Sequence, residues 1–498
     1  MAETETQDQA YVDNGVKIVQ TDVDNKDGQV KCPKCGSTDI STNAATGQLR
    51  CNFCRFEFEP QKLEMETDIS KLSGTTIGSG AQDIVADTKD QITLKCTSCG
   101  AEVVIDTASA NQARCHWCRN TLSLNQQIPN GAIPDMVLAF KVKKDEAKKA
   151  IESFVGKRKF YAHPKFRQEF TTNNIMGVYF PYMVVDLNTH SHLTGLGEHQ
   201  TRSYSEGSGE HRVTYYDADL YQVGRDFDLT IHGLSIESNK DRLDTTNKTK
   251  TNNIINSIMP FDVENSVKYD SNYLKGFTSE RRDSNITELT PIITERAKDI
   301  ARFSANASLK NYDRGVSWQS EQLDIKGQQW KAAYLPVWLY SYQEDKGDRK
   351  LLHYVAVNAR TKESMGSVPI YLPKLFLFAF LVELLGIFGF IKLDFDYDFL
   401  LLLVGPLYFF YIYTKYRNQN ARDQYETETK TNVTNLKTMD HFVEHRKRLR
   451  NSMIENQNNT SVRGASMNLK KKTGLGLDLD LKNFAADQLS SITDQFLK

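Results

Sequence analysis

The cysteines constrain this chain more than any other feature does. They form four Cys-x-x-Cys pairs, and no cysteine follows residue 118 of the 498. The pairs fall into two quartets, and in both of them fifteen residues separate the second cysteine from the third. The first quartet is Cys32, Cys35, Cys51 and Cys54, and the second is Cys96, Cys99, Cys115 and Cys118.

This repeated spacing is typical of structural zinc sites. A Cys-x-x-Cys turn presents two thiolates to one ion, and fifteen residues are enough for a hairpin that brings the second turn back to the first. Gly36 and Gly100 follow the second ligand of each quartet, where the chain must bend sharply. The sequence therefore predicts two structural Zn²⁺ ions, held by zinc ribbons at 31–59 and 94–123. Four thiolates close the coordination shell, so we expect neither ion to be catalytic.

Two other readings of the quartets fit less well. Disulfides suit exported chains, and this sequence begins without a basic segment followed by an apolar run. A redox-active dithiol needs a single pair at a strand-to-helix junction rather than paired quartets. His116, between two cysteines of the second quartet, could replace one ligand, but we expect it to point outward.

The ribbons can bind protein or nucleic acid, and their charge favours protein. Each ribbon carries a net charge of +1 by residue count, a weak electrostatic match to phosphate. Phe53, Phe56 and Trp117 are candidate anchors for a protein partner, although the same aromatic rings could instead complete the small ribbon cores.

The strongest apolar signal lies at 372–414. Residues 375–391 contain one charge, Glu383, and residues 399–413 contain none. Each run approaches the length that spans about 30 Å of hydrocarbon at 1.5 Å per residue. The sequence predicts a transmembrane hairpin here, with a buried hairpin of a soluble core as the other reading. Glu383 would then make a helix–helix contact, which is compatible with a homo-oligomer, or would form part of a proton path.

The basic residues around this hairpin predict its orientation. Lysine and arginine flank both ends, whereas the connecting turn carries three aspartates and one lysine. By the positive-inside rule, we expect a multi-pass protein of the cell membrane with both termini cytoplasmic.

The rest of the chain supplies the remaining domains, because 498 residues exceed one ordinary domain. We predict a disordered acidic N-terminus at 1–30, a flexible linker at 60–93, a cytosolic α+β domain at 134–370 and a cytosolic helical tail at 415–498. The α+β domain includes a helix at 145–155, with Ala147, Ile151, Phe154 and Val155 on one side. The predicted fold class is thus multidomain: two small β zinc ribbons, the α+β domain, the hairpin and the helical tail.

Three weaker signals leave their alternatives open. His190, His192, His199 and His211 form either a metal or pH-sensing patch or, as we favour, a solvated β ribbon. The basic run at 445–450 can touch anionic lipid or nucleic acid, or form a plain solvated helix. The amphipathic C-terminus can dock on its own protein, lie on a membrane or capture a partner. Its apolar residues are Leu481, Phe484, Ala485, Leu489, Ile492 and Phe496.

No catalytic motif is present. The sequence lacks a phosphate-binding loop, a zinc-protease helix, a serine nucleophile elbow and a dinucleotide fingerprint. We therefore expect a protein that is not an enzyme.

The chain resembles a family of bacterial membrane-anchored proteins with transcription factor IIB-type zinc ribbons. The resemblance covers about 94–415 and rests on an ordered set of motifs. They are Cys96-Thr-Ser-Cys99-Gly100, Cys115-His-Trp-Cys118, Pro134-Asp135, Gly177-Val-Tyr-Phe-Pro181, Pro260-Phe-Asp262, Tyr273-Leu-Lys-Gly-Phe277, Tyr334-Leu-Pro-Val-Trp338 and Val357-Asn-Ala-Arg-Thr361. The resemblance implies a link to phage-shock-type envelope-stress systems, in which some members take part.

Together these patterns predict a membrane-anchored cytosolic zinc-ribbon adaptor. It would recruit a cytosolic protein partner to the inner face of the membrane, where anchoring raises the effective concentration. The alternative is a membrane-associated nucleic-acid-binding protein that acts in transcription or replication. Salt separates the two, because phosphate binding weakens steeply with ionic strength.

Overall fold

The computed structural model describes the chain in many segments with gaps between them. They are residues 10–13, 15–19, 32–37, 40–42, 48–63, 65, 68–82, 91–95, 102–106, 113–117, 121–122, 127–128, 134–207, 212–239, 258–269, 271–274, 276–280, 282–346, 349–392, 403–416 and 429–449. The chain divides into two compact units. Unit 1 comprises 1–189, 230–296 and 325–432, and unit 2 comprises 190–229, 297–324 and 433–498.

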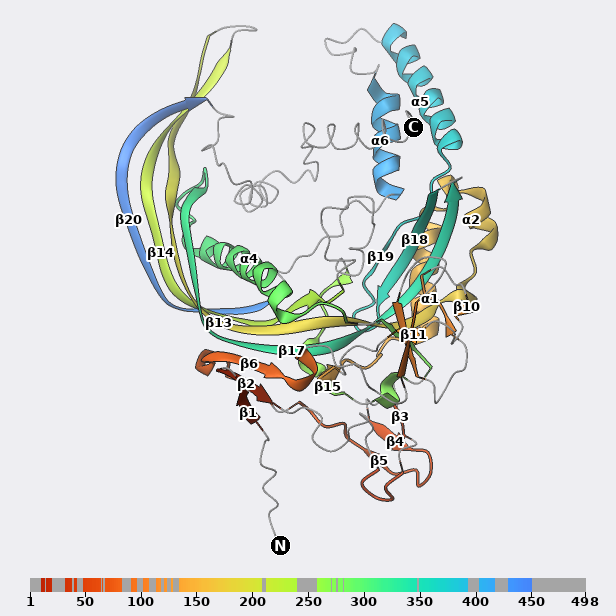
Figure 1. Cartoon of the computed structure of the whole chain (residues 1–498). Coiled ribbons are helices and arrows are strands. Elements are labelled where there is room, and N and C mark those ends of the chain that lie inside the picture. The colour runs from red at the N-terminus through yellow and green to blue at the C-terminus, as the bar shows by residue number, and fades with distance from the viewer. Residues whose placement is uncertain are drawn as a thin grey trace. The chain divides into compact units, whose positions relative to one another are not determined.

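Unit 1 is built on a mixed β-sheet (Figure 1). Its strands follow the order β1-β2-β6-β17-β13-β16-β8-β7-β11. In that order they are Ala10–Asp13, Val16–Val19, Gly74–Gly78, Val316–Lys346, Met176–Glu206, Thr278–Glu280, Glu102–Asp106, Gln91–Lys95 and Gln127–Ile128. Four further strands pair beside this path: β12 (Met136–Val137), β15 (Val267–Lys268), β18 (Arg349–Asn358) and β19 (Ser364–Gly366).

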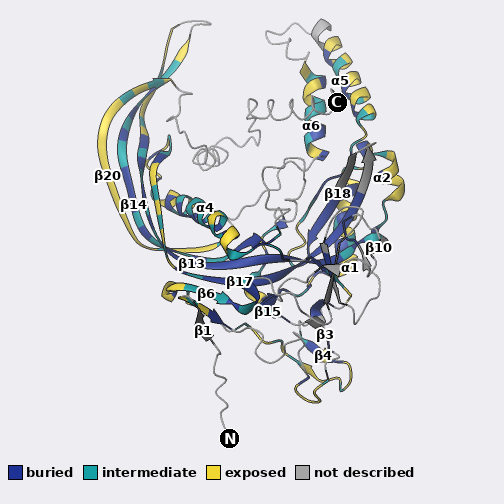
Figure 2. Ribbon diagram, in the orientation of Figure 1, coloured by how far each residue is buried: buried dark blue, intermediate teal, exposed yellow. Residues whose placement is uncertain are grey.

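Strand β13, near the middle of this sheet, is buried through most of its part in unit 1. Strand β13 pairs in parallel with β16, and β17 pairs in parallel with β6. Parallel strands are usually covered on both faces and read as nearly continuous apolar runs. Residues 178–187 of β13 follow this rule, because every one of them is buried (Figure 2).

Helix α1 (Lys144–Gly156) confirms the helix predicted from the apolar spacing. Its four predicted core residues, Ala147, Ile151, Phe154 and Val155, are all buried. Helix α2 (Pro164–Glu169) starts with a proline in its first turn, where no backbone N–H is needed. Helix α4 (Ile286–Ala305) has 20 residues.

Two segments expected to be flexible or disordered contain strands of this sheet. The predicted linker at 60–93 includes β6, and its backbone is fixed by Asp135, which accepts a hydrogen bond from Gly80 N at 2.7 Å. The other carboxylate oxygen of Asp135 accepts from Ala332 N at 2.7 Å. The predicted acidic N-terminus includes β1 and β2, which form an antiparallel pair. The acidic composition of this segment concealed the apolar residues of β2, of which Ile18 and Val19 are buried.

The prediction of a transmembrane hairpin at 372–414 is wrong. Within the described ranges, none of the helices has the length and apolar character that crossing a lipid bilayer requires. Helix α6 (Val404–Tyr416) has only 13 residues, about 20 Å at 1.5 Å per residue. The predicted multi-pass location and the membrane as a partner rested on this hairpin and are corrected with it.

Polar contacts explain how α5 (Leu372–Lys392) and α6 pack in unit 1. Glu383, predicted to make a helix–helix contact, accepts a hydrogen bond from Gly405 N of α6 at 2.7 Å. A side chain at Gly405 would collide with Glu383, so the glycine permits this close approach. The tyrosine hydroxyls of Tyr161 and Tyr408 lie 2.6 Å apart, and Tyr416 accepts from Tyr161 N at 3.0 Å.

Unit 2 contains parts of β13, β14 (Val213–Glu237), β17 and β20 (Lys430–Leu449), together with the second half of α4. Strand β14 pairs with β13 and with β20. Buried Glu198 of β13 lies 2.8 Å from Arg448 of β20, and buried Arg225 of β14 pairs with Asp440 of β20. Two buried charges of opposite sign thus hold β20 against this sheet.

The prediction of a helical tail at 415–498 is wrong, because residues 430–449 form strand β20. The run of charged residues at 440–448 suggested an exposed helix, but the β-branched residues Thr431, Val433, Thr434 and Thr438 favour an extended chain. Acidic side chains on β14 then pair with the basic side chains of β20. The amphipathic C-terminus at 481–496 lies outside the described residues.

Candidate metal centre

The first cysteine quartet is gathered around one point in unit 1. The four sulfurs of Cys32, Cys35, Cys51 and Cys54 all lie within 4.8 Å of one another. Cys32 Sγ is 3.5 Å from Cys54 Sγ, and Cys35 Sγ is 3.6 Å from Cys51 Sγ. A tetrahedron with Zn–S bonds of about 2.3 Å has sulfur–sulfur edges of about 3.8 Å. The group can therefore hold a metal ion, and its size is consistent with zinc.

Both Cys-x-x-Cys turns have the same backbone geometry. Gly36 N donates to Cys32 O at 2.8 Å, and Arg55 N donates to Cys51 O at 2.9 Å. The residue after the second ligand has a positive φ in each turn, 72° at Gly36 and 60° at Arg55. Glycine adopts this conformation without cost, but a residue with a Cβ atom does so under strain. The second turn is therefore held in a shape that its own sequence disfavours.

The surroundings shift the pKa values of the Cys51 and Cys35 thiols in opposite directions. Amide hydrogen bonds, the largest from Cys54, lower the pKa of Cys51 to about 6. A backbone hydrogen bond at Ser37 favours the Cys35 thiolate, but desolvation and the other three sulfurs raise the pKa of Cys35 to about 12. A bound dication would favour the thiolate form of both residues, since metal binding releases the thiol protons.

A short sheet supports the quartet. Strands β3 (Ile40–Thr42), β4 (Leu49–Cys51) and β5 (Glu57–Phe58) pair antiparallel in that order. Ile40 and Leu49 are fully buried in the same apolar cluster as Tyr273 and Leu274 of unit 1. The ribbon is therefore packed onto its unit on one side.

The aromatic residues of the ribbons separate into two groups. Phe53, between two ligands of the first quartet, is 81% exposed, and Phe56 is 39% exposed. Trp117 is buried, where its indole N–H donates to the carboxylate of Glu280. Of the three candidate anchors, Phe53 is thus the one most available to a partner.

The second quartet is described only in part. Cys115 is buried, and Cys96, Cys99 and Cys118 lie outside the described residues. Its flanking strands are β7 and β8, which pair antiparallel, and β9 (Ala113–Arg114) with β10 (Thr121–Leu122). His116 does not point outward as predicted but is buried, with Nε2 2.6 Å from Glu280 Oε1. Glu280 lies 164 residues away in sequence, so no local pattern could have indicated this contact.

The four histidines of the predicted patch do not all lie together in the described residues. His190 and His192 share the carboxylate of Asp226, while His199 Nδ1 lies 2.8 Å from Asn311 O. His211 lies outside the described residues.

No family model, curated protein or solved structure matches this chain.

Proposed function

We propose that this protein is a zinc-ribbon adaptor, in which Zn²⁺ bound by Cys32, Cys35, Cys51 and Cys54 fixes a turn that presents Phe53 to a protein partner. The observation that carries the proposal is the quartet itself: four sulfurs gathered within 4.8 Å of one another, with an exposed aromatic ring between two of them. By its matching spacing, the second quartet would hold a second Zn²⁺ ion.

Zinc would act here as a structural link. Four thiolates fill a tetrahedral shell and leave no position for substrate, so the ion would hold the two turns together rather than carry out a reaction. The proposed protein is accordingly a binding protein and not an enzyme.

Charge and exposure favour a protein partner. The ribbon at 31–59 has a net charge of +1, whereas phosphate binding requires a basic surface. An exposed phenylalanine that enters an apolar pocket is a common energetic anchor of protein interfaces. The resemblance to transcription factor IIB-type zinc-ribbon proteins implies a link to envelope-stress systems, in which the proposed adaptor would act.

The test compares three variants of the full chain with the wild type in affinity capture from the native host. Phe53→Ala should retain zinc and lose the partner, and Cys32→Ser/Cys35→Ser should lose one Zn²⁺ ion per chain and the partner. Phe303→Ala is the matched control, because Phe303 is also exposed (41%) but belongs to unit 2.

The readouts are zinc content by mass spectrometry and the protein and nucleic acid recovered at low and high salt. A protein that is retained by Phe303→Ala and lost by Phe53→Ala supports the adaptor. Recovery of nucleic acid that is salt-labile and sensitive to nuclease, with no protein dependent on Phe53, overturns it in favour of nucleic-acid binding.

A further inference from the structure

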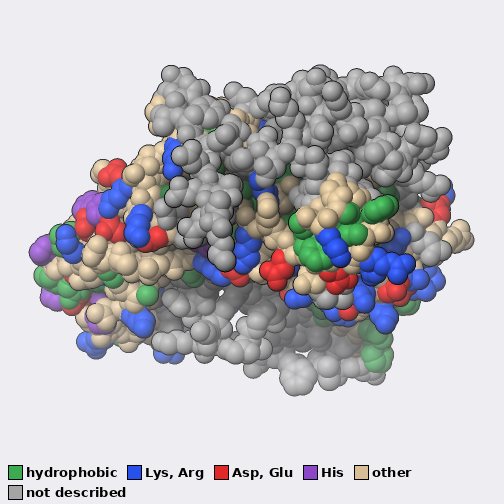
Figure 3. All heavy atoms as spheres, turned by 90° about the horizontal axis from the view of Figure 1, so that it is seen from below, with side chains coloured by type: hydrophobic (Ala, Val, Ile, Leu, Met, Phe, Trp, Pro, Cys, Tyr) green, Lys and Arg blue, Asp and Glu red, His purple; other side chains and the backbone are tan. Residues whose placement is uncertain are grey.

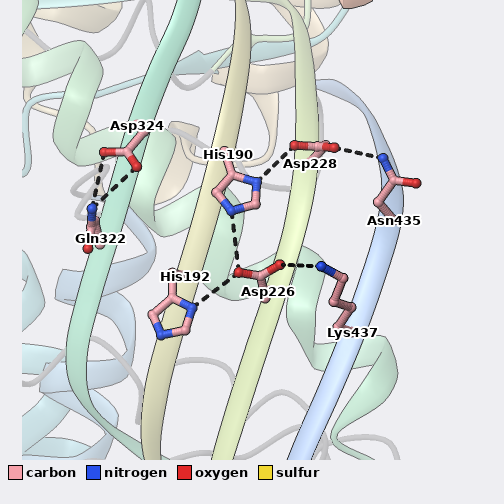
Figure 4. A network of polar contacts seen from close by, with 8 residues as sticks. All are labelled: His190, His192, Asp226, Asp228, Gln322, Asp324, Asn435 and Lys437. Atoms are coloured by element: carbon pink, nitrogen blue, oxygen red, sulfur yellow. Dashed lines mark hydrogen bonds and ion pairs between the residues drawn. The ribbon is translucent and has the colours of Figure 1, made fainter.

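A second group of potential metal ligands lies in unit 2, on the paired strands β13 and β14 (Figure 4). His190 and His192 are two residues apart on β13, so their rings lie on the same face of the strand. Asp226 and Asp228 are likewise two residues apart on β14 and lie on that same face, as Figure 4 shows. We call these four residues the histidine–aspartate cluster. On the face drawn in Figure 3, histidines lie beside acidic and basic side chains.

One carboxylate oxygen is shared by both rings. Asp226 Oδ2 lies 3.3 Å from His190 Nε2 and 3.3 Å from His192 Nδ1. Two imidazole nitrogens and one carboxylate oxygen form the donor set that proteins use for iron, zinc and other divalent transition metals. Three protein ligands also leave coordination positions open, in contrast to the closed shell of four thiolates.

The remaining residues form an outer layer that orients these donors. His190 Nδ1 lies 2.9 Å from Asp228 Oδ1, which leaves Nε2 of the same ring directed toward Asp226. Asp228 Oδ2 in turn accepts a hydrogen bond from Asn435 Nδ2 of β20 at 2.7 Å. A carboxylate behind a metal-binding histidine fixes the ring orientation and makes the imidazole a stronger ligand.

Two carboxylates, Asp226 and Asp228, give the cluster the negative charge that favours a cation. Lys437 Nζ is 3.8 Å from Asp226 Oδ1, the oxygen that does not face the rings, and its side chain is 75% exposed. Lys437 can therefore swing into solvent when a dication binds.

We propose that His190, His192 and Asp226 form an open binding site for a divalent transition-metal ion, with Asp228 and Asn435 positioning His190. Among the described residues, the cysteine quartet is the one group with three or more ligand atoms within 4.8 Å of one another. In the histidine–aspartate cluster the two nitrogens flank Asp226 Oδ2, and the 40% exposure of the His192 side chain leaves its ring room to turn toward a bound ion. This site is independent of the zinc-ribbon function proposed above.

The experiment titrates Co²⁺ into the full-length, zinc-loaded protein and follows heat and visible absorption. We expect one further equivalent to bind without the thiolate-to-cobalt charge-transfer band that a cysteine site would give. His190→Gln/His192→Gln should abolish this binding. Asp228→Asn should weaken it by about 10- to 100-fold, because the histidine loses its orienting carboxylate.

Two control variants keep the test decisive. His199→Gln removes a histidine of the same unit whose ring contacts Asn311 O, and it should bind Co²⁺ like the wild type. Lys437→Ala removes the competing cation and should bind Co²⁺ more tightly. The proposal is overturned if no further Co²⁺ binds to a folded wild-type protein, or if His190→Gln/His192→Gln and His199→Gln bind it equally.

Discussion

The cysteine quartet of unit 1 and the histidine–aspartate cluster of unit 2 show two ways in which one chain assembles donor atoms. The quartet draws all its ligands from residues 32–54, so two local turns and one hairpin bring the sulfurs together. The cluster instead joins residues of β13 to residues 34 to 38 positions later on β14, and strand pairing alone makes them neighbours. Around a bound ion, four thiolates would close the first site, whereas two imidazoles and one carboxylate would leave the second open.

This difference determines how each region responds to loss of a bound metal ion. The quartet lies in a small ribbon whose strands have two or three residues, and a bound metal ion would stabilise such a ribbon. The cluster lies on long strands that already belong to a sheet, and the ion pair between buried Arg225 and Asp440 holds that sheet without any metal ion. Metal loss should therefore unfold the first region and leave the second folded.

The largest expected effect comes from breaking the quartet. Cys32→Ser/Cys35→Ser removes two of four ligands, and structural zinc contributes about 10–16 kcal/mol of apparent binding free energy in zinc-finger peptides. We expect the loss of one zinc per chain and rapid hydrogen exchange in β3, β4 and β5. Strands β13, β14 and β20 should keep their protection from exchange within unit 2. Loss of that protection in the same variant would contradict the claim that unit 2 stays folded without the ribbon's metal.

An intermediate effect should follow from Asp186, a buried carboxylate of unit 1 that contrasts with the half-buried Asp226. Its Oδ2 lies 2.6 Å from Lys331 Nζ, and its Oδ1 accepts from Gly233 N at 2.8 Å. Breaking a buried ion pair from one side costs about 3–5 kcal/mol, so Asp186→Asn should lower the free energy of unfolding by about that amount. Asp324→Asn, at an exposed position, should change it by less than about 0.5 kcal/mol.

Asp186 should also make the stability of the fold depend on pH, and the sign of that dependence follows from its pKa. Burial alone would raise the pKa of Asp186, but His232 and Lys331 lower it below its usual value. Its contribution to stability is therefore complete above the unfolded pKa of about 3.9 and is lost as the pH falls through the depressed folded pKa. Denaturation curves below about pH 4 should be less pH-dependent in Asp186→Asn than in the wild type. Equal slopes would show that Asp186 does not carry this linkage.

The smallest effect concerns strain within the quartet. Arg55→Gly places glycine at a φ of 60° and should stabilise the zinc-loaded ribbon by about 1 kcal/mol. Gly36→Ala, at the matching position of the other turn, should destabilise it by about the same amount. Competition with a zinc chelator measures both. Weaker zinc retention in Arg55→Gly would mean that the arginine side chain, and not its backbone, sets the stability of the turn.

Sequence reasoning succeeded where the signal was local. The spacing of the first quartet predicted a group that the structure brings together, and the apolar spacing at 145–155 predicted α1 with its four buried residues. It failed where tertiary contacts decide the outcome. Strand β20 reads as a charged helix until the acidic strand beside it is known, and His116 is buried because Glu280 comes from a distant strand.

The apolar run at 372–414 shows a further limit of such reasoning. Composition alone cannot tell how much of a run becomes helix, and α6 begins only at Val404. Glu383, an unfavourable residue for a bilayer, is instead bonded to the backbone of Gly405. The proposed histidine–aspartate site could be suspected from His190-x-His192, but its carboxylate follows from strand register and not from sequence.

The most direct test of the central claim is X-ray absorption at the zinc edge. The full chain carrying Cys96→Ser/Cys99→Ser would be loaded with one equivalent of Zn²⁺, so that the first quartet is the intact cysteine site. The account predicts four sulfur neighbours at about 2.3 Å and no nitrogen or oxygen ligand. A shell with fewer sulfurs, or oxidised cysteines that bind no zinc, would contradict it.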